Sequence, residues 1–117
     1  IAEDVDGEAL STLVVNRIIQ LGGTPVLTPA DWMKLAKCDY EAPVDPYVEV
    51  VLEQNLRGER CAIQRYKQLA DLTNGKDHTT HQMVTTILNE ELEHEQDIED
   101  WILDIQRMKE DFKKMRA

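Results

Sequence analysis

Glu91 and His94 are the two residues of this sequence whose types and spacing point most directly to chemistry. They form a Glu-x-x-His pair in a segment with helical periodicity, and a separation of three residues places both side chains on one helix face. A carboxylate and an imidazole that project toward one point can bind a metal ion. The pair alone is weak support, because seven of the twelve residues at 89–100 are acidic.

The apolar stripes of two long expected helices give a stronger indication. Glu59 occupies a stripe position in one helix, and Glu91 and His94 interrupt the stripe of the other in its middle. The remaining stripe positions are Val48, Leu52, Asn55 or Leu56, Ile63, Tyr66, Leu69 and Ala70 in the first helix, and Val84, Ile87, Ile98, Ile102, Ile105, Met108 and Phe112 in the second. Burying unpaired carboxylates is costly, so a bound cation explains all three polar residues together. The alternative is a solvated charged face with a histidine at its edge.

Four helical segments must position these residues, at about 2–21, 29–36, 46–73 and 80–115. Gly22-Gly23 ends the first segment, and Asp45-Pro46 is typical of an N-cap followed by proline. Turn-forming residues at 74–77 precede the last segment, which Thr79 or Thr80 is expected to cap. Long helices, short connections and no strand pattern predict an all-α, up-and-down helical bundle forming a single domain over residues 1–117.

Composition and charge narrow the classes of function. The 117 residues include 13 Lys and Arg against 23 Asp and Glu, which gives a net charge of −10. Such a charge attracts cations and disfavours direct binding of nucleic acid, and the basic segment at 113–116 is short. No apolar run is long enough to predict a membrane span, and two cysteines do not make a disulfide framework, so a cytoplasmic location is expected. Because the sequence opens at Ile1 in a helical pattern, we expect a fragment.

Several motifs together resemble one known family. They are 17–27 (RIIQLGGTPVL), Cys38 with Tyr40 and Ala42-Pro43, 59–66 (ERCAIQRY), 73–77 (TNGKD) and 90–97 (EELEHEQD). In this combination the chain resembles the thioferritins, which are Dps-like, bacterioferritin-related members of the ferritin-like superfamily. The resemblance covers roughly residues 13–112. It implies a ferritin-like four-helix bundle of which this chain lacks the first helix and part of the second.

The resemblance also implies a function and a set of site residues. It implies a cytoplasmic, homo-oligomeric cage, dodecameric in this family, that oxidises ferrous iron with hydrogen peroxide and stores the ferric mineral. Glu59, Glu91 and His94 would be ligands and catalytic residues of a carboxylate-bridged di-iron centre. A carboxylate-rich set with few imidazoles suits iron, or manganese, better than zinc or copper.

Two departures from the family pattern concern the rest of the centre. The family's first helix, which supplies a Glu, is absent from this sequence. The second-helix Glu-x-x-His falls on Gly7 and Leu10, so these ligands are lost or the amino-terminal residues are misassigned. Glu3 or Asp6 are possible substitutes. The competing function is therefore a non-catalytic cage or interaction bundle with a degenerate metal site.

The resemblance assigns Cys38 and Cys61 to a thiol pair near the di-iron centre. Cys61 lies about 200° around the helix from Glu59, which argues against direct metal ligation and allows a disulfide with Cys38. We expect a redox-active pair, with two small buried hydrophobic residues as the alternative.

Three further polar side chains are weighed as accessory residues. Tyr66 is expected to be a core tyrosine that bonds helix backbone, although a hydrogen bond near the centre is also open. His78 and His81 are expected at the surface, with a role on an iron path as the alternative.

Overall fold

Three α-helices make up most of this computed structural model, which describes residues 4–26, 38, 42 and 44–116. They are α1 (Asp4–Gln20), α3 (Val48–Thr73) and α4 (His78–Arg116). The short helix expected at 29–36 lies outside the described residues. Among the described helices none is long and apolar enough to cross a membrane. The all-α prediction is confirmed, and within the described residues no strand is present.

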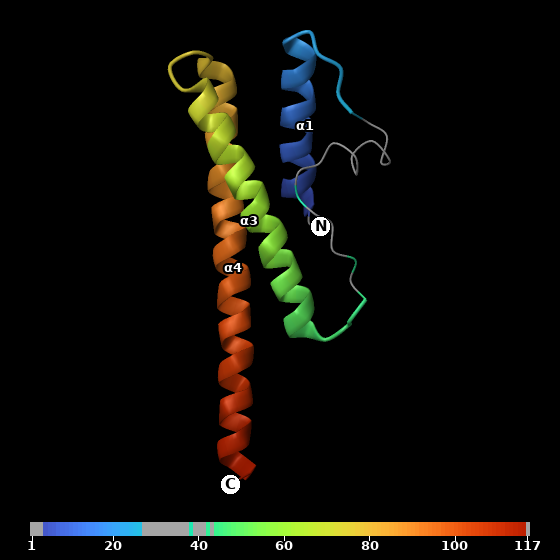
Figure 1. Cartoon of the computed structure of the whole chain (residues 1–117), viewed down its shortest axis with the longest axis vertical. Coiled ribbons are helices and arrows are strands. Elements are labelled where there is room, and N and C mark those ends of the chain that lie inside the picture. Colours follow the sequence, from blue (N-terminus) through green and yellow to red (C-terminus); the bar gives the residue numbers. More distant parts are fainter. Residues whose placement is uncertain (1–3, 27–37, 39–41, 43, 117) are drawn as a thin grey trace.

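The core lies between α3 and α4, which run antiparallel, side by side, from their connecting turn (Figure 1). The buried apolar side chains come from both helices at stripe positions, and Val84 and Ile87 are completely shielded from solvent. The buried apolar set is Ile63, Ala70, Val84, Ile87 and Ile98. Farther along, the stripe is open to solvent, since Met108 is 68% exposed. The half of the hairpin next to the turn is therefore its best-packed part.

Two glycines end α1. The Gly23 amide donates to the Ile18 carbonyl and the Gly22 amide donates to the Ile19 carbonyl, each over 2.9 Å. This pair of bonds is a Schellman motif, and Gly22 has the positive φ of 83° that the motif requires at this position. A side chain at Gly22 would be strained, so the glycine fixes the end of the helix.

Asp77, and not Thr79 or Thr80, caps α4, so the expected cap was wrong. Asp77 Oδ1 accepts the Thr80 backbone amide at 3.1 Å, and Oδ2 accepts the Thr80 hydroxyl. Arg17 of α1 donates to both carboxylate oxygens at 3.0 and 3.2 Å, and its Nε donates to Thr80 Oγ1 at 2.7 Å. Asp77 is preferred because it closes the turn and binds α1 at the same time.

The start of α3 also differs from the expectation. Asp45 was expected to cap the helix, but its Oδ1 accepts the Tyr47 amide and the helix begins at Val48, two residues beyond Asp45-Pro46.

His81 of α4, near the carboxyl end of α3, was expected at the surface but is half-buried. Its Nδ1 donates to the Ala70 carbonyl at 2.9 Å, which connects the two helices near their turn.

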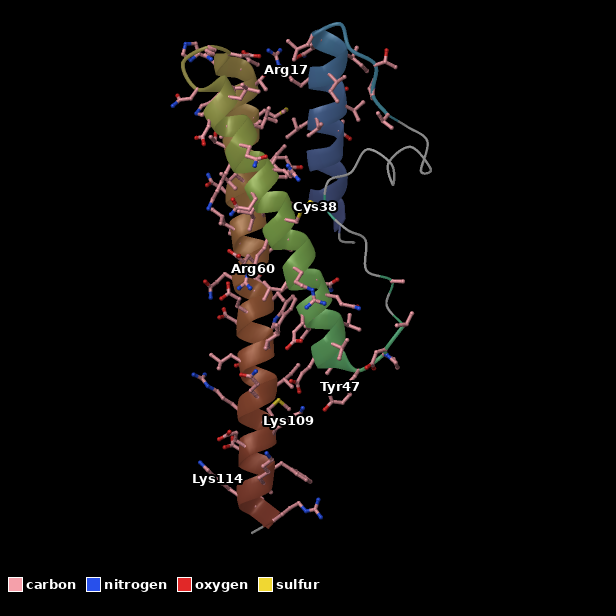
Figure 2. All side chains as sticks on the ribbon, viewed as in Figure 1. Arg17, Cys38, Tyr47, Arg60, Lys109 and Lys114 are labelled. Carbon is pink, nitrogen blue, oxygen red and sulfur yellow. A yellow bond between two sulfur atoms is a disulfide. The ribbon has the colours of Figure 1, made fainter. Side chains whose placement is uncertain are left out.

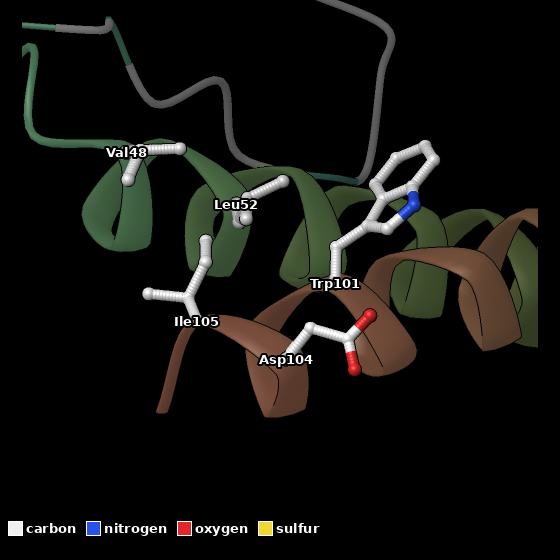
Figure 3. A pocket seen from close by; sticks show the side chains of 5 residues that line it. All are labelled: Val48, Leu52, Trp101, Asp104 and Ile105. Carbon is white, nitrogen blue, oxygen red and sulfur yellow. The ribbon is translucent and has the colours of Figure 1, made fainter. Parts of the chain in front are cut away.

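An apolar groove lies between the first part of α3 and the second half of α4 (Figure 3). It has a volume of about 380 Å³ and is lined by Val48, Leu52, Trp101, Asp104 and Ile105. Beyond it, Lys109 forms an ion pair with Glu49 and stacks over the Tyr47 ring, 4.9 Å from its centroid. Among the described residues, the apolar side chains Val48 and Trp101 at this end are about half exposed, and they are distinct from the cluster of Glu59, described next.

Candidate metal centre

Glu59 of α3 and the pair Glu91 and His94 of α4 come together across the hairpin. Their potential ligand atoms all lie within 4.8 Å of one another. His94 Nδ1 is 3.9 Å from Glu91 Oε1 and 4.0 Å from Glu59 Oε2. All three side chains are partly buried. Two carboxylates and an imidazole at these separations can converge on a single cation after small side-chain adjustments.

The electrostatics of Glu59 are those of a carboxylate without a compensating positive charge. Its pKa is raised to about 8, first by burial and then by the neighbouring Glu91, through a hydrogen bond and through its negative charge. Glu95 adds a smaller effect of the same sign. Among the described residues, Glu59 Oε2 is buried and has no hydrogen-bond partner. A divalent cation at this point would satisfy the orphaned oxygen and reverse the repulsion.

Tyr66 lies two turns beyond Glu59 on the same stripe and is half-buried. Burial raises the pKa of its hydroxyl, and the negative charges of Glu91 and Glu59 raise it further. The ring is therefore within electrostatic reach of both carboxylates. Both alternatives, a hydrogen bond to helix backbone and one near the centre, stay predictions.

An ion pair beside the cluster was missed by the sequence analysis. Arg60 Nε donates to Glu95 Oε2 at 3.1 Å, and Arg60 Nη2 lies 3.7 Å from Glu99 Oε1. The available signal was positional: Arg60 directly follows Glu59, and Glu95 directly follows His94. In antiparallel helices that bring Glu59 and His94 together, these next residues also lie close to each other.

Cys38 and Cys61 form a disulfide, with their Cα atoms 5.8 Å apart (Figure 2). The bond attaches the segment at Cys38 to α3, two residues after Glu59. Both cysteines are half-buried. The alternative of two unbonded buried hydrophobic residues was wrong, and neither sulfur is a free thiolate available to a metal in this state.

Comparison with known proteins identifies the family. Residues 11–108 match the ferritin-like domain, which is most of the chain. The chain belongs to the ferritin-like family. This result confirms the resemblance and the ferritin-like fold.

Two ferritin-like proteins are similar to this chain in sequence or structure. A dodecameric thioferritin from Bacteroides fragilis, described as a bacterioferritin-related protein, has a similar structure with a TM-score of 0.88 and 48% sequence identity. The match covers 92% of this chain and 64% of that one. A DNA protection during starvation protein from Pyrococcus furiosus is 33% identical over 109 residues, which cover 80% of this chain and 59% of that protein. The chain thus spans about three fifths of the length of these relatives.

The ferritin-like resemblance also predicts further ligands at positions before residue 12. Gly7 and Leu10, which fall where the family's second helix has Glu and His, lie on α1, but their side chains are outside the described part of the structure. Asp6 also lies on α1 with its side chain outside the described part, and Glu3 is outside the described residues altogether. The described cluster therefore consists of three candidate ligand residues from α3 and α4, and ligands from the amino-terminal side remain a prediction.

Proposed function

We propose that this protein oxidises ferrous iron at a centre formed by Glu59, Glu91 and His94 and stores the ferric product. The observation that carries the proposal is the convergence of these three side chains within 4.8 Å around a buried carboxylate oxygen that lacks a partner among the described residues. Iron is both the bound ion and the substrate. Carboxylate oxygens with one imidazole suit iron or manganese, and membership of the ferritin-like family supports iron.

The role of each residue follows from its charge. Glu59 and Glu91 supply negative charge, which favours the more highly charged ferric ion over the ferrous ion and so assists electron loss. His94 supplies a neutral nitrogen ligand. We propose hydrogen peroxide as the oxidant, because two ferrous ions supply the two electrons that convert one peroxide, with two protons, into two waters. This pairing of electrons avoids the release of hydroxyl radical. The second ion needs further ligands, for which the amino-terminal part of the protein is the proposed source.

Iron loading tests the proposal. Ferrous ion is added anaerobically to the purified protein, then peroxide or dioxygen, and the ferric absorbance is followed against a buffer control. We expect rapid oxidation with peroxide, slower oxidation with dioxygen, and a soluble ferric product that stays with the protein. Glu59→Gln and His94→Ala should each slow the reaction by at least about tenfold.

A matched control separates the site from general negative charge. Glu93 is exposed and lies one residue before His94, so Glu93→Gln makes the same substitution as Glu59→Gln but outside the cluster. It should leave the rate unchanged. If the unmodified protein oxidises iron no faster than buffer, the competing function remains, namely a non-catalytic cage or interaction bundle with a degenerate site.

We also propose that the protein acts as a homo-oligomeric cage with a storage cavity. The support is the dodecameric state of the B. fragilis relative, at 48% identity. Light scattering on the purified protein tests it, and a monomer at micromolar concentration would contradict it. With a net charge of −10, we expect no direct binding of DNA, which a gel-shift titration at low salt would check.

The disulfide supports a redox role for the two cysteines. We propose that the Cys38–Cys61 bond is made and broken in use: the dithiol and one hydrogen peroxide give the disulfide and two waters, and a cellular thiol reductant returns the pair to its reduced form. Thiol titration of the reduced protein before and after peroxide should show a loss of two thiols. An unchanged count would remove the redox role.

A further inference from the structure

Arg60 and Glu95 form an ion pair at the rim of the candidate centre. Glu95 lies four residues after Glu91, about 40° around α4 and about 6 Å along its axis. It therefore lies on the edge of the face that carries Glu91 and His94. Its side chain is 23% exposed, whereas that of Arg60 is 52% exposed. The carboxylate lies between the cluster and solvent.

The position of Glu95 links it to the cluster as well as to Arg60. Its partner Arg60 directly follows Glu59 in α3, so the ion pair joins α3 and α4 beside the cluster. The oxygens of Glu95 are outside the group of ligand atoms within 4.8 Å of one another, and its Oε2 accepts a hydrogen bond from Arg60 Nε at 3.1 Å. Glu95 is thus close to the centre and held at its edge by an arginine.

We propose that Glu95 is a further metal ligand of this centre and that Arg60 is a positioning residue that holds its carboxylate aside until a cation binds. This inference rests on the proposed function, since it assigns an additional ligand to the same site. On binding, the Glu95 side chain changes rotamer, exchanging the Arg60 hydrogen bond for coordination. The Glu95 oxygen replaces a water ligand of the hydrated cation, and no covalent bond is made or broken.

The exchange is physically inexpensive. Arg60 is half-exposed, and ion pairs of that kind contribute little to stability because water solvates the separated charges well. Arg60 also keeps a second carboxylate partner, Glu99, whose oxygen is already 3.7 Å from Nη2. The arginine is therefore not left without a counter-charge when Glu95 departs. A partly buried carboxylate, by contrast, gains strongly from a divalent cation.

Metal affinity, measured without turnover, tests the role of Glu95. Cobalt(II) is titrated anaerobically into the purified metal-free protein, and its visible absorption reports both the affinity and the number of ligands. Glu95→Gln should weaken binding by about tenfold and alter the spectrum, as expected for loss of a contact at the metal. Glu93→Gln is the matched control and should change neither quantity.

Arg60→Gln distinguishes coordination from simple electrostatics. If Arg60 competes for Glu95, its removal strengthens cobalt(II) binding by about threefold, because the binding-competent rotamer becomes the more populated one. The gain must vanish in the Arg60→Gln/Glu95→Gln double variant, since no carboxylate remains to release. Equal gains in both backgrounds would mean that Arg60 acts only by its charge, and they would overturn the proposal.

The two proposals fail in different ways. An unmodified protein that binds no cobalt(II) would contradict the metal centre itself. A protein that binds cobalt(II) through Glu59 and His94, with Glu95→Gln unchanged in affinity and spectrum, would overturn only the role assigned to Glu95. Thermal unfolding of the metal-free variants verifies that each of them folds.

Discussion

Cation binding at the candidate centre should release a proton, and the amount is set by the raised pKa of Glu59. With a pKa of about 8, this carboxyl is mostly protonated at pH 7, and a metal ion must displace the proton in order to bind. The Glu59 contribution is about 0.9 proton per ion at pH 7, about 0.5 at pH 8 and about 0.2 at pH 8.5. The apparent affinity should rise by about eightfold between pH 7 and pH 8.5 for the same reason.

Calorimetry measures this release directly. Cobalt(II) is titrated into the metal-free protein in pairs of buffers of equal pH but different ionisation enthalpy, and the difference in heat gives the protons released. Glu93→Gln should behave as the unmodified protein. A release that is close to zero at pH 7, or that does not fall as the pH rises to 8.5, would refute the assignment of a protonated, buried Glu59 at the point where the cation binds.

The raised pKa of Glu59 also predicts that the metal-free protein becomes less stable as the pH rises. The folded state holds the Glu59 proton more tightly than the unfolded state does, because the folded pKa lies above the ordinary value of 4.5. The stabilisation is therefore complete below pH 4.5 and is lost as the pH rises through about 8. Bound cation should remove this loss, so the difference in Tm between loaded and metal-free protein should increase with pH over this window.

Three further predictions concern the scaffold. Ile87 is completely buried, and Ile87→Ala should lower the free energy of unfolding by about 3 kcal/mol in urea titrations. Reduction of the Cys38–Cys61 disulfide, which joins residues 23 apart, should lower it by about 3 kcal/mol. Hydrogen bonds from Thr80 lower the pKa of Asp77 below 3.8. The stabilisation by this cap is therefore present above pH 3.8 and is lost on acidification. The loss should be measured as a fall in Tm, which Asp77→Asn should abolish.

Each of these scaffold predictions has a control. Leu72 is 65% exposed, so Leu72→Ala should change the free energy of unfolding by no more than about 0.5 kcal/mol. Equal losses for Leu72→Ala and Ile87→Ala would contradict the position of the core. A protein with serine in place of both cysteines should be insensitive to reductant. The role of the cap would be contradicted if the Tm of Asp77→Asn fell on acidification in parallel with that of the unmodified protein.

The long helices were predictable because the sequence pattern that specifies them is local and is repeated along the chain. Periodic apolar residues define α3 and α4 over many turns, and the glycines after α1 allow only a helix end there. The caps were less predictable, because several neighbouring residues can serve. Asp45 lies three residues before the start of α3, whereas Asp77 directly precedes α4 and also receives an arginine from another helix. That contact is tertiary and leaves no local signal.

The candidate centre was predictable where a residue breaks a pattern. Glu59, Glu91 and His94 are polar residues in apolar stripes, and the structure brings them together. The ion pair of Arg60 with Glu95 breaks no pattern, since charged residues at the edge of a helix face are ordinary. Arg60 and Glu95 meet because of the register in which α3 packs against α4. That register is a property of the tertiary structure and cannot be read from either helix alone.

The disulfide makes residues 38–61 a covalent ring that includes about the first four turns of α3. A single cut in the backbone of this ring by a protease would leave both new ends attached to the same molecule. The helix that carries Glu59 would then remain tethered to α1 as one piece on a non-reducing gel, and would separate from it only after a reductant is added.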